Sequence, residues 1–72
     1  MPNLSERLIQ LQAERNMLKK DIANAVGLSI MGYYRYENGD RQPTADVIIK
    51  LCNYFNVSAD YLLGLSDEPE RR

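Results

Sequence analysis

The chain has 72 residues, of which 44% are hydrophobic and 26% charged, and its formal net charge at pH 7 is −1. This length predicts one small globular domain. Without an apolar run long enough to span a membrane or a secretory signal, we expect a cytoplasmic protein. A single cysteine, Cys52, and the lack of histidine exclude an internal disulfide and a Cys/His zinc site. We expect Cys52 to be a small buried residue, and we expect no metal or cofactor.

The first predicted helix covers about residues 4–15. Its apolar residues are four and three positions apart and form one stripe: Leu4, Leu8 and Leu11. Asn3 is the natural N-cap, and Glu6 follows it at the position of a capping box. We expect Asn16 to end the helix in the left-handed conformation. A continuous helix over residues 4–26 is the alternative, because neither Gly nor Pro marks the break.

Residues 22–39 predict the end of one helix, a tight turn and a second helix. Gly27 can take the left-handed conformation that closes a helix over about residues 19–26. Ser29 is placed to cap the next helix, which begins at Ile30 and which Gly39 would close. This is the pattern of the helix-turn-helix, whose second helix enters the major groove of DNA.

Two more helices are expected after a polar loop. Thr44 is the N-cap of the fourth helix, which ends at Asn56 and whose inward residues are Val47, Ile48, Leu51 and Phe55. Ser58 caps the fifth helix and Gly64 ends it. Residues 66–72 are expected to form a short, frayed tail, so the predicted domain covers residues 1–65.

Three motifs carry a family resemblance: Tyr-Glu-Asn-Gly at residues 36–39, Arg-Gln-Pro at 41–43, and Asn-Val-Ser-Ala-Asp-Tyr-Leu-Leu-Gly at 56–64. Over about residues 7–64 the chain resembles the Cro/repressor-type (xenobiotic-response-element type) helix-turn-helix regulators of phages and bacteria. The resemblance implies an all-α, compact five-helix bundle of the lambda-repressor-like type. It also implies a sequence-specific, double-stranded DNA-binding transcriptional regulator, most simply a repressor that acts as a homodimer on a palindromic operator.

The resemblance also implies roles for individual residues. Base reading falls to Ile30, Met31, Gly32 and Arg35. Phosphate contacts fall to Lys19, Lys20, Ser29, Tyr34, Asn38 and Arg41. Candidate dimer residues are Tyr54, Tyr61, Leu62 and Leu65, although for Leu62 a place in the ordinary core is an equal alternative. Arg35 can bind guanine O6 and N7 bidentately, whereas Ile30 and Met31 can contact only a thymine methyl group.

The phosphate-binding positions depart from the family pattern at three places. Lys19 stands where Gln is usual, and Leu18 stands where Ser or Thr commonly caps the second helix. Asp40 stands where a basic residue often follows Gly, so Arg41 is expected to carry that contact. Lys19 and Lys20 are expected to bind phosphate at the start of the second helix.

The scaffold positions fit the family with two departures. The expected inward residues are Ala23, Val26, Leu28, Tyr33 and Tyr36, of which Tyr33 replaces a branched aliphatic residue and needs a partner for its hydroxyl. Gln12 stands where an Arg often pairs with the residue corresponding to Glu37. Glu37 is therefore expected either to bond Gln12 or to be partly exposed.

A protein-interaction module with the same fold, antitoxin-like or regulator-binding, is the alternative function. The near-neutral charge and the apolar outward residues Ile30, Met31 and Tyr34 favour it. Four basic residues around the helix-turn-helix favour DNA: Lys19, Lys20, Arg35 and Arg41. An enzyme is not expected, because the chain has no histidine and offers little room for a substrate cleft.

Overall fold

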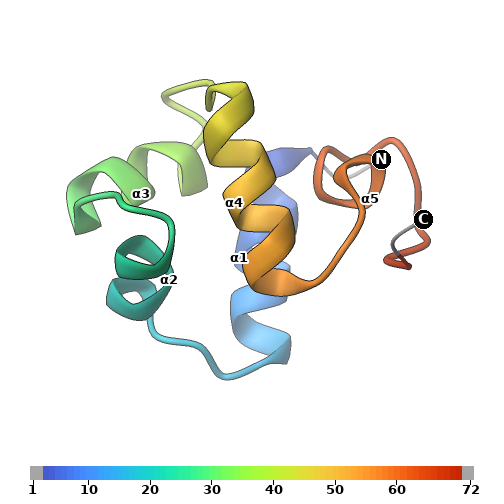
Figure 1. The fold of residues 1–72 in the computed structure, drawn as a ribbon, viewed down its shortest axis with the longest axis horizontal. Helices are drawn as coiled ribbons and strands as arrows, with labels where there is room; N and C mark the ends of the chain where they lie inside the picture. Colours follow the sequence, from blue (N-terminus) through green and yellow to red (C-terminus); the bar gives the residue numbers. More distant parts are fainter. Residues whose placement is uncertain (1–2, 71–72) are drawn as a thin grey trace.

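Five helices account for most of residues 3–70, which are the residues that the computed structural model describes (Figure 1). The helices are α1 (Leu4–Glu14), α2 (Lys19–Ala25), α3 (Ile30–Glu37), α4 (Ala45–Phe55) and α5 (Ala59–Leu62). α3 packs on α1 and α2, while α5 packs on α1 and α4, and α2 also touches α4. The predicted all-α five-helix bundle is confirmed.

Side chains cap four of the five helices at their N-termini. Asn3, Ser29, Thr44 and Ser58 each accept the backbone N–H of the residue three positions later, at 2.9–3.3 Å. α2 is the exception, because Leu18 stands at its N-cap and makes no side-chain cap hydrogen bond. All four predicted caps and the missing fifth cap are confirmed, because capping depends on residues close in sequence.

Left-handed residues end the helices where the sequence indicated. Asn16 has φ 52° between α1 and α2, so the alternative of one continuous helix over residues 4–26 is wrong. Asn56 has φ 57° after α4, and Gly27 and Gly39 take φ 72° and 79° after α2 and α3. α1 and α2 each end one residue earlier than predicted, with Arg15 and Val26 as C-caps.

The core is formed by the inward stripes of all five helices. Of the predicted inward residues of the helix-turn-helix, Leu28 is half-buried and the other four are buried. Cys52 is buried as expected. The largest fully buried side chains are Tyr33, Phe55, Leu8, Leu11, Ile22, Leu51, Leu62, Val26 and Val57.

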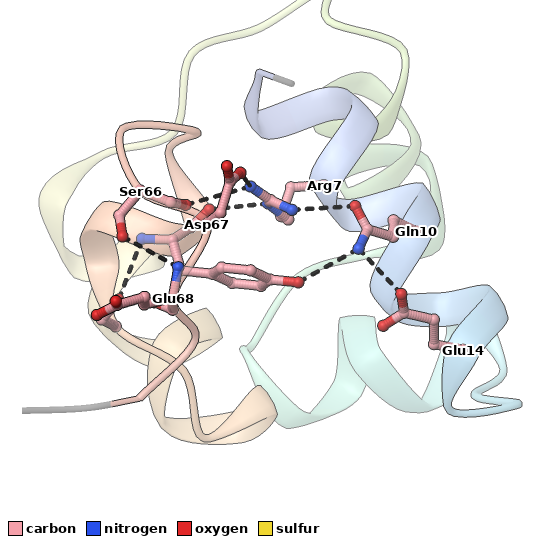
Figure 2. A network of polar contacts seen from close by, with 8 residues as sticks. Arg7, Gln10, Glu14, Ser66, Asp67 and Glu68 are labelled. Carbon is pink, nitrogen blue, oxygen red and sulfur yellow. Dashed lines mark hydrogen bonds and ion pairs between the residues drawn. The ribbon is translucent and has the colours of Figure 1, made fainter. Parts of the chain in front are cut away.

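A buried arginine fastens α1 to the C-terminal end of the chain (Figure 2). The Arg7 guanidinium donates from Nε to the Tyr61 carbonyl at 2.9 Å and from Nη2 to the Ser66 carbonyl at 3.3 Å. It also lies 3.8 Å from the centre of the Tyr61 ring and 3.6 Å from Asp67 Oδ1. Gln10 accepts a further hydrogen bond from Nη1 at 3.1 Å. This role of Arg7 was not predicted from the sequence.

The tail makes further contacts with the start of α5. The Ser58 N–H donates to the Pro69 carbonyl at 3.0 Å, and the Ser58 hydroxyl donates to the Glu68 carbonyl at 3.3 Å. Residues 66–70 thus lie along α5 in this structure. Arg71 and Arg72 lie outside the described residues, and fraying of residues 66–72 in solution stays a prediction.

Candidate nucleic-acid interface

α3 lies with α2 at one side of the bundle and separates its residues into a buried and an exposed face (Figure 1). Tyr33, Tyr36 and Glu37 are buried against the bundle. The opposite face is open: Met31 is 68% exposed and Ile30 is 48% exposed. α3 is therefore anchored along one side and free to contact a partner along the other.

Three of the four predicted base-reading residues are exposed on this face. Ile30 and Met31 form the first turn of α3, and Arg35 stands four residues after Met31. Residues four apart lie on the same side of a helix, so Met31 and Arg35 share one surface. Met31 and Arg35 are thus brought together on one surface, and Ile30 is exposed next to Met31 in the first turn.

For Gly32, the fourth of these residues, the local structure explains why the position has no side chain. Its N–H donates to the Ser29 hydroxyl at 3.0 Å, and a Cβ at this position would lie 3.2 Å from the same Ser29 Oγ. A larger side chain would crowd the cap that begins α3. The absence of a side chain thus protects the helix start.

The predicted phosphate-binding residues surround α3 but differ in their surroundings. Lys20 and Arg41 are exposed, as is Asp40 beside Arg41. Asn38 is the C-cap of α3 and is exposed, whereas the Ser29 hydroxyl accepts the cap hydrogen bond within the chain. Tyr34 is exposed as well, so Lys20, Tyr34, Asn38 and Arg41 are the residues of this set that lie open to solvent, while the Ser29 hydroxyl is used by the cap.

Lys19 forms an ion pair within the chain. Its Nζ lies 2.9 Å from Oε1 of Glu37, which is only 5% exposed, and 4.1 Å from the centre of the Tyr34 ring. The hydrogen bond to Glu37 is the main reason that the pKa of Lys19 is raised. Both expectations for Glu37 are wrong: it is buried, and its carboxylate pairs with Lys19 rather than with Gln12.

The second Glu37 oxygen and the Tyr33 hydroxyl are buried polar atoms without a hydrogen bond among the described residues. Burial, together with the nearby negative charge of Glu37, raises the pKa of the Tyr33 hydroxyl above its usual value. The Glu37 carboxylate is the polar group that acts on the Tyr33 hydroxyl, but no hydrogen bond joins the two in this geometry.

The sequence contains a signal for each of the two polar groups whose contacts were not predicted, Glu37 and Arg7. The Arg that often pairs with the residue at the Glu37 position is replaced here by Gln12, which indicates that a cation from elsewhere must serve Glu37. Arg7 stands three residues after Leu4 and four before Leu11, so helical spacing already places it on the inward stripe. Neither signal names the partner, because Lys19 lies on another helix than Glu37, and Arg7 bonds residues more than 50 positions away in the chain.

The candidate dimer residues fall into two groups. Tyr61 and Leu62 are buried in the core of the chain itself. For Leu62 this is the alternative that the sequence left open, an ordinary core residue. Tyr54 is half-buried and packs edge-to-face on Phe55 with ring centres 5.5 Å apart. Leu65 is 68% exposed.

Two further properties concern residues 3–70 as a whole. No helix in this range is long and apolar enough to cross a membrane. The same residues contain no group of three or more His, Cys, Asp or Glu side chains that could hold a metal ion.

A short helix that supports a second, outward-facing helix within an all-α bundle defines a helix-turn-helix domain. Residues 9–62 match the helix-turn-helix family. The chain belongs to the Cro/repressor-type helix-turn-helix family of transcriptional regulators.

Two relatives and two solved structures illustrate the similarity. The chain is 33% identical to the HTH-type transcriptional regulator ImmR of Bacillus subtilis over 97% of its own length, and 30% identical to the cryptic phage CTXphi transcriptional repressor RstR of Vibrio cholerae over 85%. It spans about half of these relatives, 54% of each. A transcriptional regulator from Listeria innocua superposes with a TM-score of 0.81 at 27% identity, over 86% of this chain and 58% of that one. The P22 c2 repressor, solved with a synthetic operator, shares the fold with a TM-score of 0.81 at 21% identity, over 88% of this chain and 96% of that one.

Proposed function

We propose that this chain binds double-stranded operator DNA sequence-specifically and regulates transcription, as a repressor. The observation that carries the proposal is the exposure of Ile30, Met31 and Arg35 on one face of α3 while its other face is anchored in the core. The relatives ImmR and RstR, named as a transcriptional regulator and a repressor, support it. Repression would be steric, because a protein bound at a promoter blocks polymerase.

In the proposed complex α3 lies in the major groove. Arg35 donates two hydrogen bonds to one guanine, and Ile30 and Met31 contact thymine methyl groups. Gly32 lets the first turn of α3 approach the bases closely. Five residues in or beside α3 contact phosphates and set its register: Lys20, Ser29 with its short polar side chain, Tyr34 through its hydroxyl, Asn38 and Arg41.

We further propose that the chain acts in the cytoplasm as a homodimer on a palindromic operator. Two recognition helices would then lie one helical turn of DNA apart, about 34 Å. Leu65 and Tyr54 are the candidate contact residues that retain exposed surface. Tyr61 and Leu62 would support this interface from within the core. No enzymatic activity is proposed.

A protein-interaction module is the second candidate function. It is favoured by the apolar surface of α3, on which Ile30, Met31 and Tyr34 are 48%, 68% and 39% exposed. Such residues are costly to leave open to water without a partner. The same surface fits thymine methyl groups, and the exposed cations Lys20, Arg35 and Arg41 around it fit DNA better than an apolar protein groove.

Salt dependence distinguishes the two functions. Each phosphate that the protein neutralises should steepen the fall of log K with log salt by about 0.9. We expect a slope of several units for binding to duplex DNA, measured by fluorescence anisotropy at several salt concentrations. A flat response, or no binding to any duplex at low salt, would favour the protein-interaction module.

A further inference from the structure

We propose that Lys19 is a positioning residue that fixes α3 against α2 through Glu37, and that it does not contact phosphate. The proposal deepens the proposed DNA-binding function and rests on it for the consequences at DNA. The position of Lys19 at the start of α2 indicates a phosphate contact, but its ion pair with Glu37 gives it a different role.

Glu37 joins three helices at the last turn of α3. Its backbone carbonyl accepts the hydroxyl hydrogen bond of Ser5 from α1, and its carboxylate binds the ammonium group of Lys19 from α2. The end of α3 is therefore held from two sides. Arg35 stands two residues earlier, so a shift at this junction moves the base-reading guanidinium relative to the groove.

Removing Lys19 from this pair is costly for the protein. Glu37 is only 5% exposed, and its second oxygen already has no hydrogen bond among residues 3–70. A buried carboxylate that loses its cation is left uncompensated, which destabilises proteins strongly. Lys19 also lies over the Tyr34 ring, a second contact that favours its present position.

Lys20 provides a matched comparison. It is the next residue on α2 and is exposed, and no ion pair within residues 3–70 involves it. Its full charge is available to phosphate. Lys19 and Glu37 together are neutral, so replacing both removes no net charge from the DNA-facing surface.

The first test needs no DNA and measures the thermal stability of Lys19→Met, Glu37→Gln and the double variant. We expect Lys19→Met to lower the melting temperature most. The double variant should recover much of that loss, because it contains no buried unpaired carboxylate. Losses that simply add would overturn the proposal, whether or not the chain binds DNA.

The second test compares DNA binding by the double variant with DNA binding by Lys20→Met, each in the otherwise wild-type chain. The salt slope is measured on a fragment selected from random DNA and on an unrelated duplex. We expect the double variant to keep the wild-type salt slope but to lose preference for the selected fragment. The preference should fall by about 5- to 150-fold, which is the discrimination that one bidentate base contact provides. Lys20→Met should reduce the slope by about 0.9 and weaken both duplexes equally.

A double variant that loses about 0.9 of the slope and binds both duplexes equally weakly would make Lys19 a phosphate contact. An unchanged preference would likewise overturn the positioning role. If the wild-type chain binds neither duplex, the proposed function fails, and the stability measurement still decides whether the ion pair joins α2 to α3.

Discussion

Arg35 is the one cation on α3, and it stands among apolar neighbours on the exposed face. Arg35→Ala should weaken binding to the selected operator by about 1–3 kcal/mol and relax the preference at one base pair. The reason is that the guanidinium fork matches guanine O6 and N7, which Ala cannot replace. Competition binding with operators that vary one position measures this effect.

Arg35→Lys is the control for charge, since it keeps the cation but loses the planar fork. We expect it to bind unrelated DNA like the wild type and still to lose the preference at that position. An equal loss on all sequences would show instead that Arg35 contacts a phosphate.

Tyr33 and Lys19 make stability sensitive to alkaline pH. Burial and the charge of Glu37 raise the pKa of Tyr33, and the hydrogen bond to Glu37 raises the pKa of Lys19. In both cases the unfolded chain loses its proton first, at about pH 10 to 10.5. Stability from these groups is therefore present below that pH and is lost as the pH rises above it.

Tyr33→Phe should leave the protein equally stable at pH 7 or stabilise it by about 1 kcal/mol, because a buried hydroxyl without a hydrogen bond is removed. The fall in stability above pH 10 should also become smaller. Denaturant unfolding at pH 7 and at alkaline pH measures both effects. A clear loss of stability at pH 7 would mean that the hydroxyl has a partner in the folded protein.

At the scale of the element, the start of α3 depends on the Ser29 cap. Ser29→Ala should reduce the free energy of unfolding by about 1 kcal/mol, since the Gly32 N–H loses its acceptor. Thr44→Ala removes the equivalent cap of α4 and is the matched control. Both variants should lose similar stability in denaturant titrations, but only Ser29→Ala should weaken DNA binding. If the two variants weaken DNA binding equally, the Ser29 cap has no specific role in the DNA-binding interface.

Local sequence predicted the elements well and their polar contacts poorly. Ser29, Thr44 and Ser58 were predicted as caps because a cap and its acceptor helix are adjacent in the chain. The partner of Glu37 lies on another helix, and its identity depends on the angle at which α2 crosses α3. The base-reading and phosphate assignments remain predictions, because they come from the family pattern and require a bound partner to be tested.

At the scale of the whole molecule, Arg7 connects the two ends of the chain. Arg7→Met should reduce the free energy of unfolding by about 1–3 kcal/mol, because the Tyr61 carbonyl loses a buried donor. Asp67→Asn is the control, since Asp67 is 89% exposed and should change stability by no more than about 0.5 kcal/mol. Thermal unfolding of the two variants measures the difference. Equal losses would place the stabilising contact in the exposed ion pair instead.

Contacts at both ends of α3 hold the helix-turn-helix in place. α1 and α2 hold the end of α3 at Glu37, and the Ser29 cap holds its start. This leaves the outer face with few polar groups and one arginine. A partner with both apolar methyl groups and hydrogen-bond acceptors, such as the major groove of DNA, suits that face.

Selection of binding sites from random double-stranded DNA tests whether α3 reads a DNA sequence. We expect one enriched sequence with two-fold symmetry, whose half-sites are centred about one helical turn apart, or about 10 base pairs. We also expect a guanine in each half-site, and we expect the Arg35→Ala variant to lose the preference for that guanine. If no sequence is enriched even at low salt, the claim that α3 reads DNA is contradicted.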